Sequence, residues 1–211
     1  MTARAELESQ RVIRELDRLD LYRVFTFAFG LPTAERYDWL CRPDLAASLE
    51  CLWQALGVPG EFPAPGCFDD YQDYESTYIA LFDVGLPEPP APLLESAHNK
   101  AVPPQQTALE NVDFYEVLGL KHNPSQFAPD HLVTQLEFLA ALSFARENTT
   151  EADNKGTLDL LEHDFLERHL LNWLPIELEK LTRQKPPIFP VLLALLLAFV
   201  RQRHTPDAKP N

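Results

Sequence analysis

The sequence predicts an all-α protein folded as one helical domain. Apolar residues recur at spacings of three and four along most of the chain, and the 19 prolines gather between the segments that show this spacing. Strand signals are weak, because alternating Val, Ile and Thr runs are few and Asn-Gly or Asp-Gly hairpin turns are missing. We expect a single helical domain over residues 1–204 and a disordered tail over residues 205–211.

The composition limits the classes of partner. The 211 residues are 45% hydrophobic, which supplies ample material for a core, and they carry a net charge of −14. A strongly acidic surface repels nucleic acid and anionic lipid and favours a basic partner, although solubility alone explains it equally well. We therefore expect no nucleic-acid partner.

Cysteine usage and targeting signals point to the cytoplasm. Cys41, Cys51 and Cys67 are odd in number and lack CxxC spacing, which argues against a disulfide framework. The N-terminus has no apolar signal-peptide region, and the apolar run over residues 191–200 is about half as long as a membrane span. The sequence predicts a cytoplasmic, reduced protein without stable membrane insertion.

The strongest helical pattern covers residues 127–146. Pro129 fixes the backbone at its start, and Asp130 can cap the first free amides. One face of this helix carries small and apolar residues, namely Leu132, Leu136, Leu139, Ala140 and Ser143. Two interpretations of its start remain open. Either Asp130 is a cap and His131 an exposed first-turn residue, or the pair lies at a binding mouth and holds a cationic or polar ligand.

The remaining helices are expected between proline and glycine breaks. We predict helices over residues 5–29, 45–56, 69–82, 107–118, 157–174 and 191–201, with a continuation over 176–183 after an interruption at Pro175. Asp44 and Thr157 are the expected caps of the second and fifth helices, and residues 148–156 are expected to be flexible. Residues 83–106 contain two breaks rich in proline, which predicts a long irregular loop; such a loop is usually either functional or disordered, and this one is the best hint of a site in the sequence.

Motifs for catalysis or metal binding are weak. Glu95 and His98 have the Glu-x-x-His spacing of di-iron helices, but no second copy exists, and His163 and His169 are six residues apart and so lie on different helix faces. No zinc, P-loop, Rossmann or nucleophile-elbow motif is present. We predict no metal, no cofactor and no enzymatic activity, with a metal- or nucleotide-dependent enzyme using Asp130 and His131 as the alternative.

Binding is the function that this sequence favours. An acidic helical protein with a deep apolar complement can hold a peptide that combines basic and apolar residues. Carboxylates would meet the basic part, and a groove between helices would take the apolar part. A helical subunit of a stable complex is a further alternative.

Three stretches together resemble the TorD/DmsD/NarJ family of redox-enzyme maturation chaperones. The first is YESTYIALFDVG over residues 74–85, followed by the prolines and PLLES over residues 92–96. The second is FYEVLGL over 114–120 with PDHL over 129–132 and QLEFL over 135–139. The third is FLERHLLNWLP over 165–175. The resemblance is nearest to the chaperones of the dimethylsulfide, ethylbenzene, selenate and chlorate oxidoreductase group.

This resemblance implies a cytoplasmic, all-helical chaperone that binds the twin-arginine leader or N-terminus of a molybdopterin oxidoreductase catalytic subunit. Such a chaperone holds back export and assists molybdenum-cofactor insertion, and it is a monomer or a dimer that exchanges helices. The peptide-binding residues that the resemblance implies are Pro129, Asp130, His131, Glu95, Ser96, Tyr78, Phe82 and Glu137. His169 and Trp173 are expected to support the fold. His98, Gln135 and Leu139 depart from the family pattern, which leaves the client open.

Overall fold

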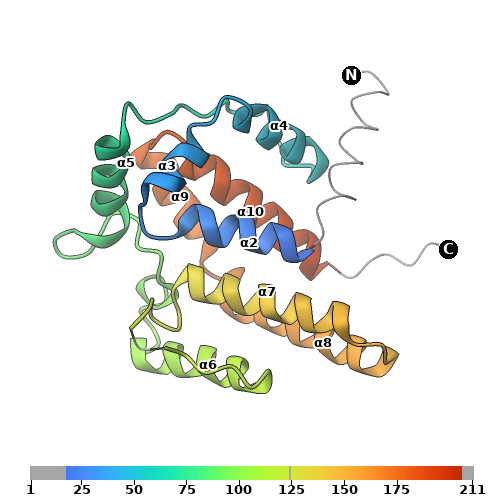
Figure 1. Ribbon diagram of the computed structural model, residues 1–211. Helices are drawn as coiled ribbons and strands as arrows, with labels where there is room; N and C mark the ends of the chain where they lie inside the picture. The colour runs from blue at the N-terminus through green and yellow to red at the C-terminus, as the bar shows by residue number, and fades with distance from the viewer. Residues whose placement is uncertain (1–17, 124, 206–211) are drawn as a thin grey trace.

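A computed structural model describes residues 18–123 and 125–205. Within these ranges the protein is all-helical, as the sequence predicts (Figure 1). The α-helices are α2 (Arg18–Phe29), α3 (Ala34–Leu40), α4 (Leu45–Ala55), α5 (Tyr71–Tyr78), α6 (Pro104–Val117), α7 (Leu132–Asn148), α8 (Ala152–Phe165), α9 (Leu174–Gln184) and α10 (Phe189–His204). Two π-helical turns (Ile79–Asp83 and Leu166–Leu170) extend α5 and α8, and Glu95–Ala97 forms a 3-10 turn.

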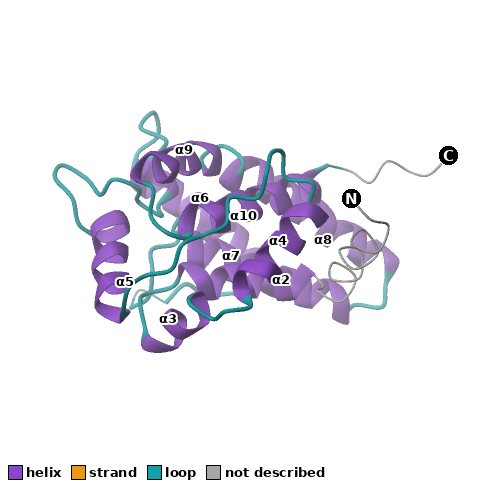
Figure 2. Ribbon diagram, turned by 90° about the horizontal axis from the view of Figure 1, so that it is seen from above, coloured by secondary structure: helices purple, strands orange, loops and turns teal. Residues whose placement is uncertain are grey.

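The helices pack around α2, α7 and α10. Helix α2 lies along α7, α8 lies on another side of α7, and α6 lies beyond them (Figure 1). Seen from above, irregular segments connect α4 with α5 and α5 with α6, while the helices fill the centre (Figure 2). Helix α10 is apolar nearly all round and is buried at most of its positions, as expected for a central helix.

Aromatic side chains fill the end of the core near the start of α10. The ring of Phe189 lies within 5.0–6.5 Å, between centroids, of the rings of Phe29, Phe68, Tyr74, Tyr78 and Phe82. Tyr74, Tyr78 and Phe82 of the predicted aromatic stripe are therefore core, and Tyr71 is partly buried against it. Rings at these distances add edge-to-face attraction to the burial of their apolar area.

Several helix boundaries follow from local chemistry. Thr33 and Asp70 cap α3 and α5, because their side chains accept hydrogen bonds from the amides of Arg36 and Asp73. The helix predicted over residues 45–56 begins at Leu45, although the Asp44 side chain forms no cap bond. Pro175 does interrupt the predicted helix over 157–174, since it lies in the first turn of a new helix, α9.

Other boundaries differ from prediction. Helix α8 begins at Ala152, so residues 152–156 are helical and Thr157 is no cap; its hydroxyl donates to the Asp153 carbonyl inside the helix. Helix α6 begins at Pro104, and the 3-10 turn precedes it, so the predicted irregular segment up to residue 106 is interrupted. The predicted N-terminal helix over 5–29 is described only from Arg18, and the tail beyond Thr205 lies outside the described residues.

The expectation about disulfides is wrong. Cys41, at the end of α3, is joined to Cys67 in the loop before α5, with a Cα–Cα distance of 5.5 Å, and Cys51 is free. An odd number of cysteines argued against a disulfide framework, but it leaves room for one bridge. Among the described residues, no helix is long and apolar enough to cross a membrane.

Candidate functional site

Two sequence patches that the resemblance singles out meet at the start of α7. Leu94 and His131 form an isolated antiparallel bridge, in which the Leu132 amide donates to the Leu93 carbonyl at 2.9 Å. The Glu95 amide donates to the Asp130 carbonyl at 3.0 Å. The structure thus brings together five of the predicted site residues: Pro129, Asp130, His131, Glu95 and Ser96.

Asp130 is not the cap of α7, contrary to one interpretation of the sequence. Its buried carboxylate accepts a hydrogen bond from the Ser96 amide at 3.1 Å and so holds the 3-10 turn against the chain before α7. The cap is His131, whose Nδ1 accepts from the Val133 amide at 3.1 Å. This bond places the imidazole proton on Nε2.

His131 is also buried, whereas a first-turn residue was expected to be exposed. Its side chain is packed against Phe127, with the two rings stacked 4.0 Å apart. Burial lowers the pKa of His131 to about 4, because it disfavours the charged imidazolium. At neutral pH this residue is therefore an uncharged cap that positions Phe127.

The Glu95 carboxylate is the centre of a buried polar cluster. It accepts hydrogen bonds from Gln135 Nε2 at 2.8 Å and from Asn111 Nδ2 at 3.0 Å, and it lies 3.1 Å from His169 Nδ1. Gln135 also donates to Asn111 Oδ1 at 3.1 Å. Three donors thus surround the carboxylate, which is what keeps such a group inside an apolar core, whereas Gln135 Oε1 and His169 Nε2 are buried without a hydrogen-bond partner among the described residues.

Tyr115 fixes the segment before α7. Its hydroxyl donates to the Pro129 carbonyl at 2.6 Å, and burial raises the pKa of Tyr115, so the phenol stays protonated. Tyr115 and Asn111 come from α6, so this helix holds both the polar cluster and the start of α7. Glu95, Asp130 and His131 are accordingly rigid parts of the scaffold.

His98 lies in a separate buried pair. Its Nε2 donates to the Pro92 carbonyl at 3.0 Å and lies 3.3 Å from Glu177 Oε2, while its ring stacks on Trp173 at 5.1 Å. Burial lowers the pKa of His98 to about 4 and raises the pKa of Glu177 to about 8. Both groups are therefore uncharged at neutral pH. The side chains of Glu95 and His98 thus have different partners, and the two residues do not form one site.

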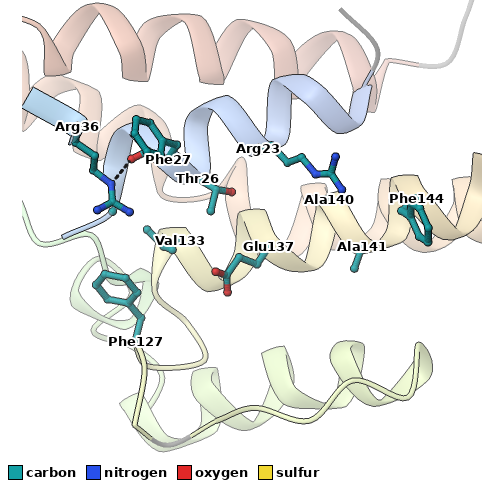
Figure 3. Close-up of a pocket in the computed structure, with 11 residues that line it drawn as sticks. Arg23, Thr26, Phe27, Arg36, Phe127, Val133, Glu137, Ala140, Ala141 and Phe144 are labelled. Carbon is teal, nitrogen blue, oxygen red and sulfur yellow. Dashed lines mark hydrogen bonds between the residues drawn. The ribbon is translucent and has the colours of Figure 1, made fainter. Parts of the chain in front are cut away.

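Beside this scaffold, a groove of about 580 Å³ opens between α2 and α7 (Figure 3). It runs from the end of α2 along one face of α7, and its lining is mostly apolar. The lining residues are Arg23, Thr26, Phe27, Gly30, Arg36, Phe127, Val133, Glu137, Ala140, Ala141 and Phe144. Phe127 stands at the end of the groove near the start of α7, and the side chain of Phe144 is 53% exposed farther along that helix (Figure 3).

Charged groups in the groove have different surroundings. Arg36 donates to the Phe27 carbonyl at 2.7 Å and to the Leu31 carbonyl at 2.6 Å, so it closes the end of α2. Glu137 has no ion-pair partner among the described residues. Glu137 is an exposed residue, but the protein atoms around its carboxyl group remove part of the solvent from that group. This desolvation raises the pKa of Glu137 above its ordinary value.

The remaining predicted site residues, Tyr78 and Phe82, lie in the aromatic core. The Tyr78 hydroxyl donates to the Phe29 carbonyl at 3.0 Å, and the Tyr78 and Phe82 rings are 4.9 Å apart. Neither side chain lines the groove. Sequence reasoning missed Phe127 and Phe144, although Val133, Glu137, Ala140 and Phe144 recur at helical spacing on a second face of α7.

The family model of the nitrate reductase delta subunit matches residues 64–176, which is more than half of the chain. The chain belongs to the nitrate reductase delta subunit family. The matched range contains all three stretches on which the resemblance to the TorD/DmsD/NarJ chaperones rests, and that resemblance is thereby confirmed.

Relatives within the nitrate reductase delta subunit family are assembly chaperones. The chain is 27% identical to the perchlorate reductase assembly chaperone protein of Dechloromonas aromatica (strain RCB), over 83% of this chain and 82% of the relative. It is 30% identical to the dimethyl sulfide dehydrogenase assembly chaperone protein of Rhodovulum sulfidophilum, over 87% and 76% of the two chains. The family is one of chaperones rather than enzymes, as the sequence predicted.

A solved structure of similar fold supports the architecture. The crystal structure of a protein assigned as a redox enzyme maturation protein from Archaeoglobus fulgidus superposes with a TM-score of 0.50, at 18% identity, over 89% of this chain and 92% of that one. At 18% identity this likeness concerns the fold alone. It confirms the all-helical, single-domain class.

Proposed function

We propose that this protein is a cytoplasmic assembly chaperone for the catalytic subunit of a molybdopterin oxidoreductase. It binds the twin-arginine leader or N-terminal segment of that subunit. The observation that carries the proposal is family membership, together with alignment over most of the length of relatives that are themselves reductase or dehydrogenase assembly chaperones.

The groove between α2 and α7 is the proposed binding site for the leader. A twin-arginine leader combines a basic segment with an apolar one. The apolar walls, including Phe127, Val133 and Phe144, suit the apolar segment, and the Glu137 carboxylate suits a guanidinium. The net charge of −14 favours the approach of a basic peptide over longer distances.

Asp130 and His131 take part in this proposal as positioning residues. The Asp130 carboxylate is engaged with the Ser96 amide, and the His131 ring holds Phe127 at the end of the groove. Glu95 and Ser96 act in the same way, because they anchor the chain before α7. Direct contact between these residues and the leader stays a prediction.

Occupation of the groove would explain both activities expected of such a chaperone. A leader held between two helices is not free to engage the export machinery. The delay gives the catalytic subunit time to receive its molybdenum cofactor before transport. The chaperone itself needs no cofactor for this role, since holding and releasing a peptide requires only differential binding.

An enzyme built around Asp130 and His131 is the weaker hypothesis. Asp130 Oδ2 already accepts from the Ser96 amide and His131 Nδ1 from the Val133 amide, and both residues are buried. A general acid or base must reach the proton that it transfers. The groove offers better access to a ligand than this pair does.

The test is a calorimetric titration with the leader peptide of a molybdenum oxidoreductase encoded beside the gene of this protein. We expect saturable binding that weakens as salt rises, because oppositely charged groups are screened. A matched peptide with both arginines replaced by glutamine should bind more weakly and show less salt dependence. Failure of the natural leader to bind at either salt concentration would contradict the leader-binding proposal.

A further inference from the structure

A pair of histidines stacks at the far end of α10, away from the groove. His163 comes from α8 and His204 from the last turn of α10, and their ring centroids are 4.1 Å apart with an interplanar angle of 25°. Glu167, in the π-helical turn that follows α8, is the third member of the cluster. One ligand atom from each of the three side chains lies within 4.8 Å of the other two.

The contact between His204 and Glu167 is too long for a hydrogen bond. His204 Nε2 lies 3.8 Å from Glu167 Oε2, and this nitrogen is buried without a hydrogen-bond partner in the described part of the chain. Buried polar atoms in native proteins generally have a partner. A metal ion that bonds at about 2.0–2.2 Å to each atom would span this separation.

We propose that His163, Glu167 and His204 bind a divalent transition-metal ion, and that Zn²⁺ is the ion which these ligands suit best. Two imidazole nitrogens and one carboxylate oxygen form a ligand set typical of zinc, with a water molecule in the fourth tetrahedral position. Mg²⁺ and Ca²⁺ are disfavoured, because they prefer sites composed of oxygen ligands. The Glu167 side chain is 63% exposed, so solvent and ion can reach the site.

The neighbouring charges are compatible with a cation. Two arginines adjoin the ligands in sequence: Arg168 is paired with Asp164 at 3.4 Å, and Arg203 is paired with Glu162 at 3.2 Å. The Glu162 carboxylate also accepts from the Tyr22 hydroxyl at 2.9 Å, which links α2, α8 and α10 directly beside the cluster. The arginine charges are thus offset locally. A bound ion would add a further connection between α8 and the end of α10.

The site is independent of the proposed leader-binding groove. None of its three ligands lines that groove, which is formed by α2, α3, α7 and the segment before α7. Loss of metal binding would therefore leave leader binding intact, and the two proposals fail separately.

The experiment is a calorimetric titration of the untagged protein with ZnCl₂ in the absence of reductant. The Cys51→Ser background removes the free thiol, which would otherwise compete for zinc. We expect one ion per chain, and we expect His163→Gln and His204→Gln to weaken binding by about tenfold or more. His122→Gln is the matched control, because His122 lies outside the cluster, and its zinc affinity should equal that of the background.

Thermal unfolding supplies a second readout. Zn²⁺ should raise the unfolding midpoint of the background protein and of His122→Gln, and it should raise the midpoints of the two histidine variants by clearly less at the same zinc concentration. Glu167→Gln covers the case in which a histidine variant is poorly folded, since the Glu167 side chain is 63% exposed and glutamine keeps its shape. Absence of saturable zinc binding, or unchanged affinity in folded Glu167→Gln and histidine variants, would overturn the proposal.

Discussion

The carboxylate of Glu95 lies 3.1 Å from Nδ1 of His169, a residue 74 positions farther along the chain. The two side chains are 4% and 1% exposed, so water does not compensate for the loss of either. This contact joins the 3-10 turn before α6 to the π-helical turn after α8. It therefore connects segments that belong to different parts of the family motif.

Replacement of Glu95 by alanine should destabilise the protein severely. The variant leaves the polar groups of Asn111, Gln135 and His169 buried without their shared acceptor. We expect a loss of about 3–5 kcal/mol in the free energy of unfolding, measured by urea denaturation. Glu88→Ala is the control, because the exposed Glu88–Lys100 pair should contribute less than about 1 kcal/mol. Equal losses in the two variants would contradict this role for Glu95.

Glu177 should make stability fall as pH rises above the acid range. Burial raises the pKa of Glu177 to about 8 in the folded protein. In the unfolded chain the pKa of a glutamate is about 4.3. The folded state therefore binds the extra proton between these values. The stability from this group is fully present below the unfolded pKa and is lost as pH rises through the folded pKa.

Glu177→Gln tests this dependence, because the amide cannot ionise. Relative to the parent, the variant should gain about 2–4 kcal/mol of unfolding free energy between pH 5 and pH 8. Urea denaturation at the two pH values measures the gain. Glu179→Gln, an exposed neighbour on α9, should show no such trend. A difference between Glu177→Gln and the parent that is the same at both pH values would rule out a protonated Glu177.

The cap of α7 should depend on an acceptor at position 131. His131→Ala removes the bond from the Val133 amide and should cost about 1 kcal/mol or somewhat more, because the stacking on Phe127 is lost as well. His131→Asn supplies another good cap acceptor and should recover part of that loss. Chemical denaturation of both variants measures the difference. Identical stabilities would show that the imidazole does not act as a cap.

Leader binding should depend on the exposed face of α7. Phe144→Ala should weaken binding by about tenfold, since truncation of a central aromatic typically costs more than about 1 kcal/mol. Calorimetry with the natural leader measures this change. Leu160→Ala is the matched control, because Leu160 is 72% exposed but lies on α8 outside the groove. Equal affinity in the two variants would direct attention to a different surface.

The charge of the groove can be tested separately. Glu137→Gln keeps the shape of the side chain and removes its carboxylate, so it should reduce both the affinity for the leader and the dependence of that affinity on salt. Glu147→Gln serves as the control, because Glu147 is exposed near the end of α7 and does not line the groove. A salt dependence unchanged by Glu137→Gln would exclude this carboxylate as the partner of an arginine.

Much of the fold could be predicted because the information is local. Thr33 and Asp70 act as caps through amides three residues away, and the buried face of α7 follows from the spacing of Leu132, Leu136 and Leu139. The cap interpretation of Asp130 was wrong because the amide that its carboxylate binds belongs to Ser96, 34 residues earlier. The sequence pattern around a residue does not reveal a competing partner from another segment.

The site was predictable only in part, for the same reason. The motifs identified Glu95, Asp130 and His131, and the structure brings these residues together, but as a buried scaffold. The groove depends on how α2 lies against α7, so Arg36 and Phe127 carry no signal in sequence alone. The start of α8 was missed because the residues after Ala152, 153–156, are polar or glycine, a composition that suits a solvated helix as well as a loop.

The π-helical turn over Leu166–Leu170 makes the packing of this region depend on the number of residues in the segment. The Leu171 amide bonds to the Leu166 carbonyl five residues back, so this turn holds one residue more than an α-helical turn. Removing one residue would convert it to α-helix and rotate the side chains on one side by about 100° relative to the other. His163 and His169 would then no longer face their present neighbours together. We therefore expect that a relative with one residue fewer in this turn lacks at least one of the contacts made by His163 and His169.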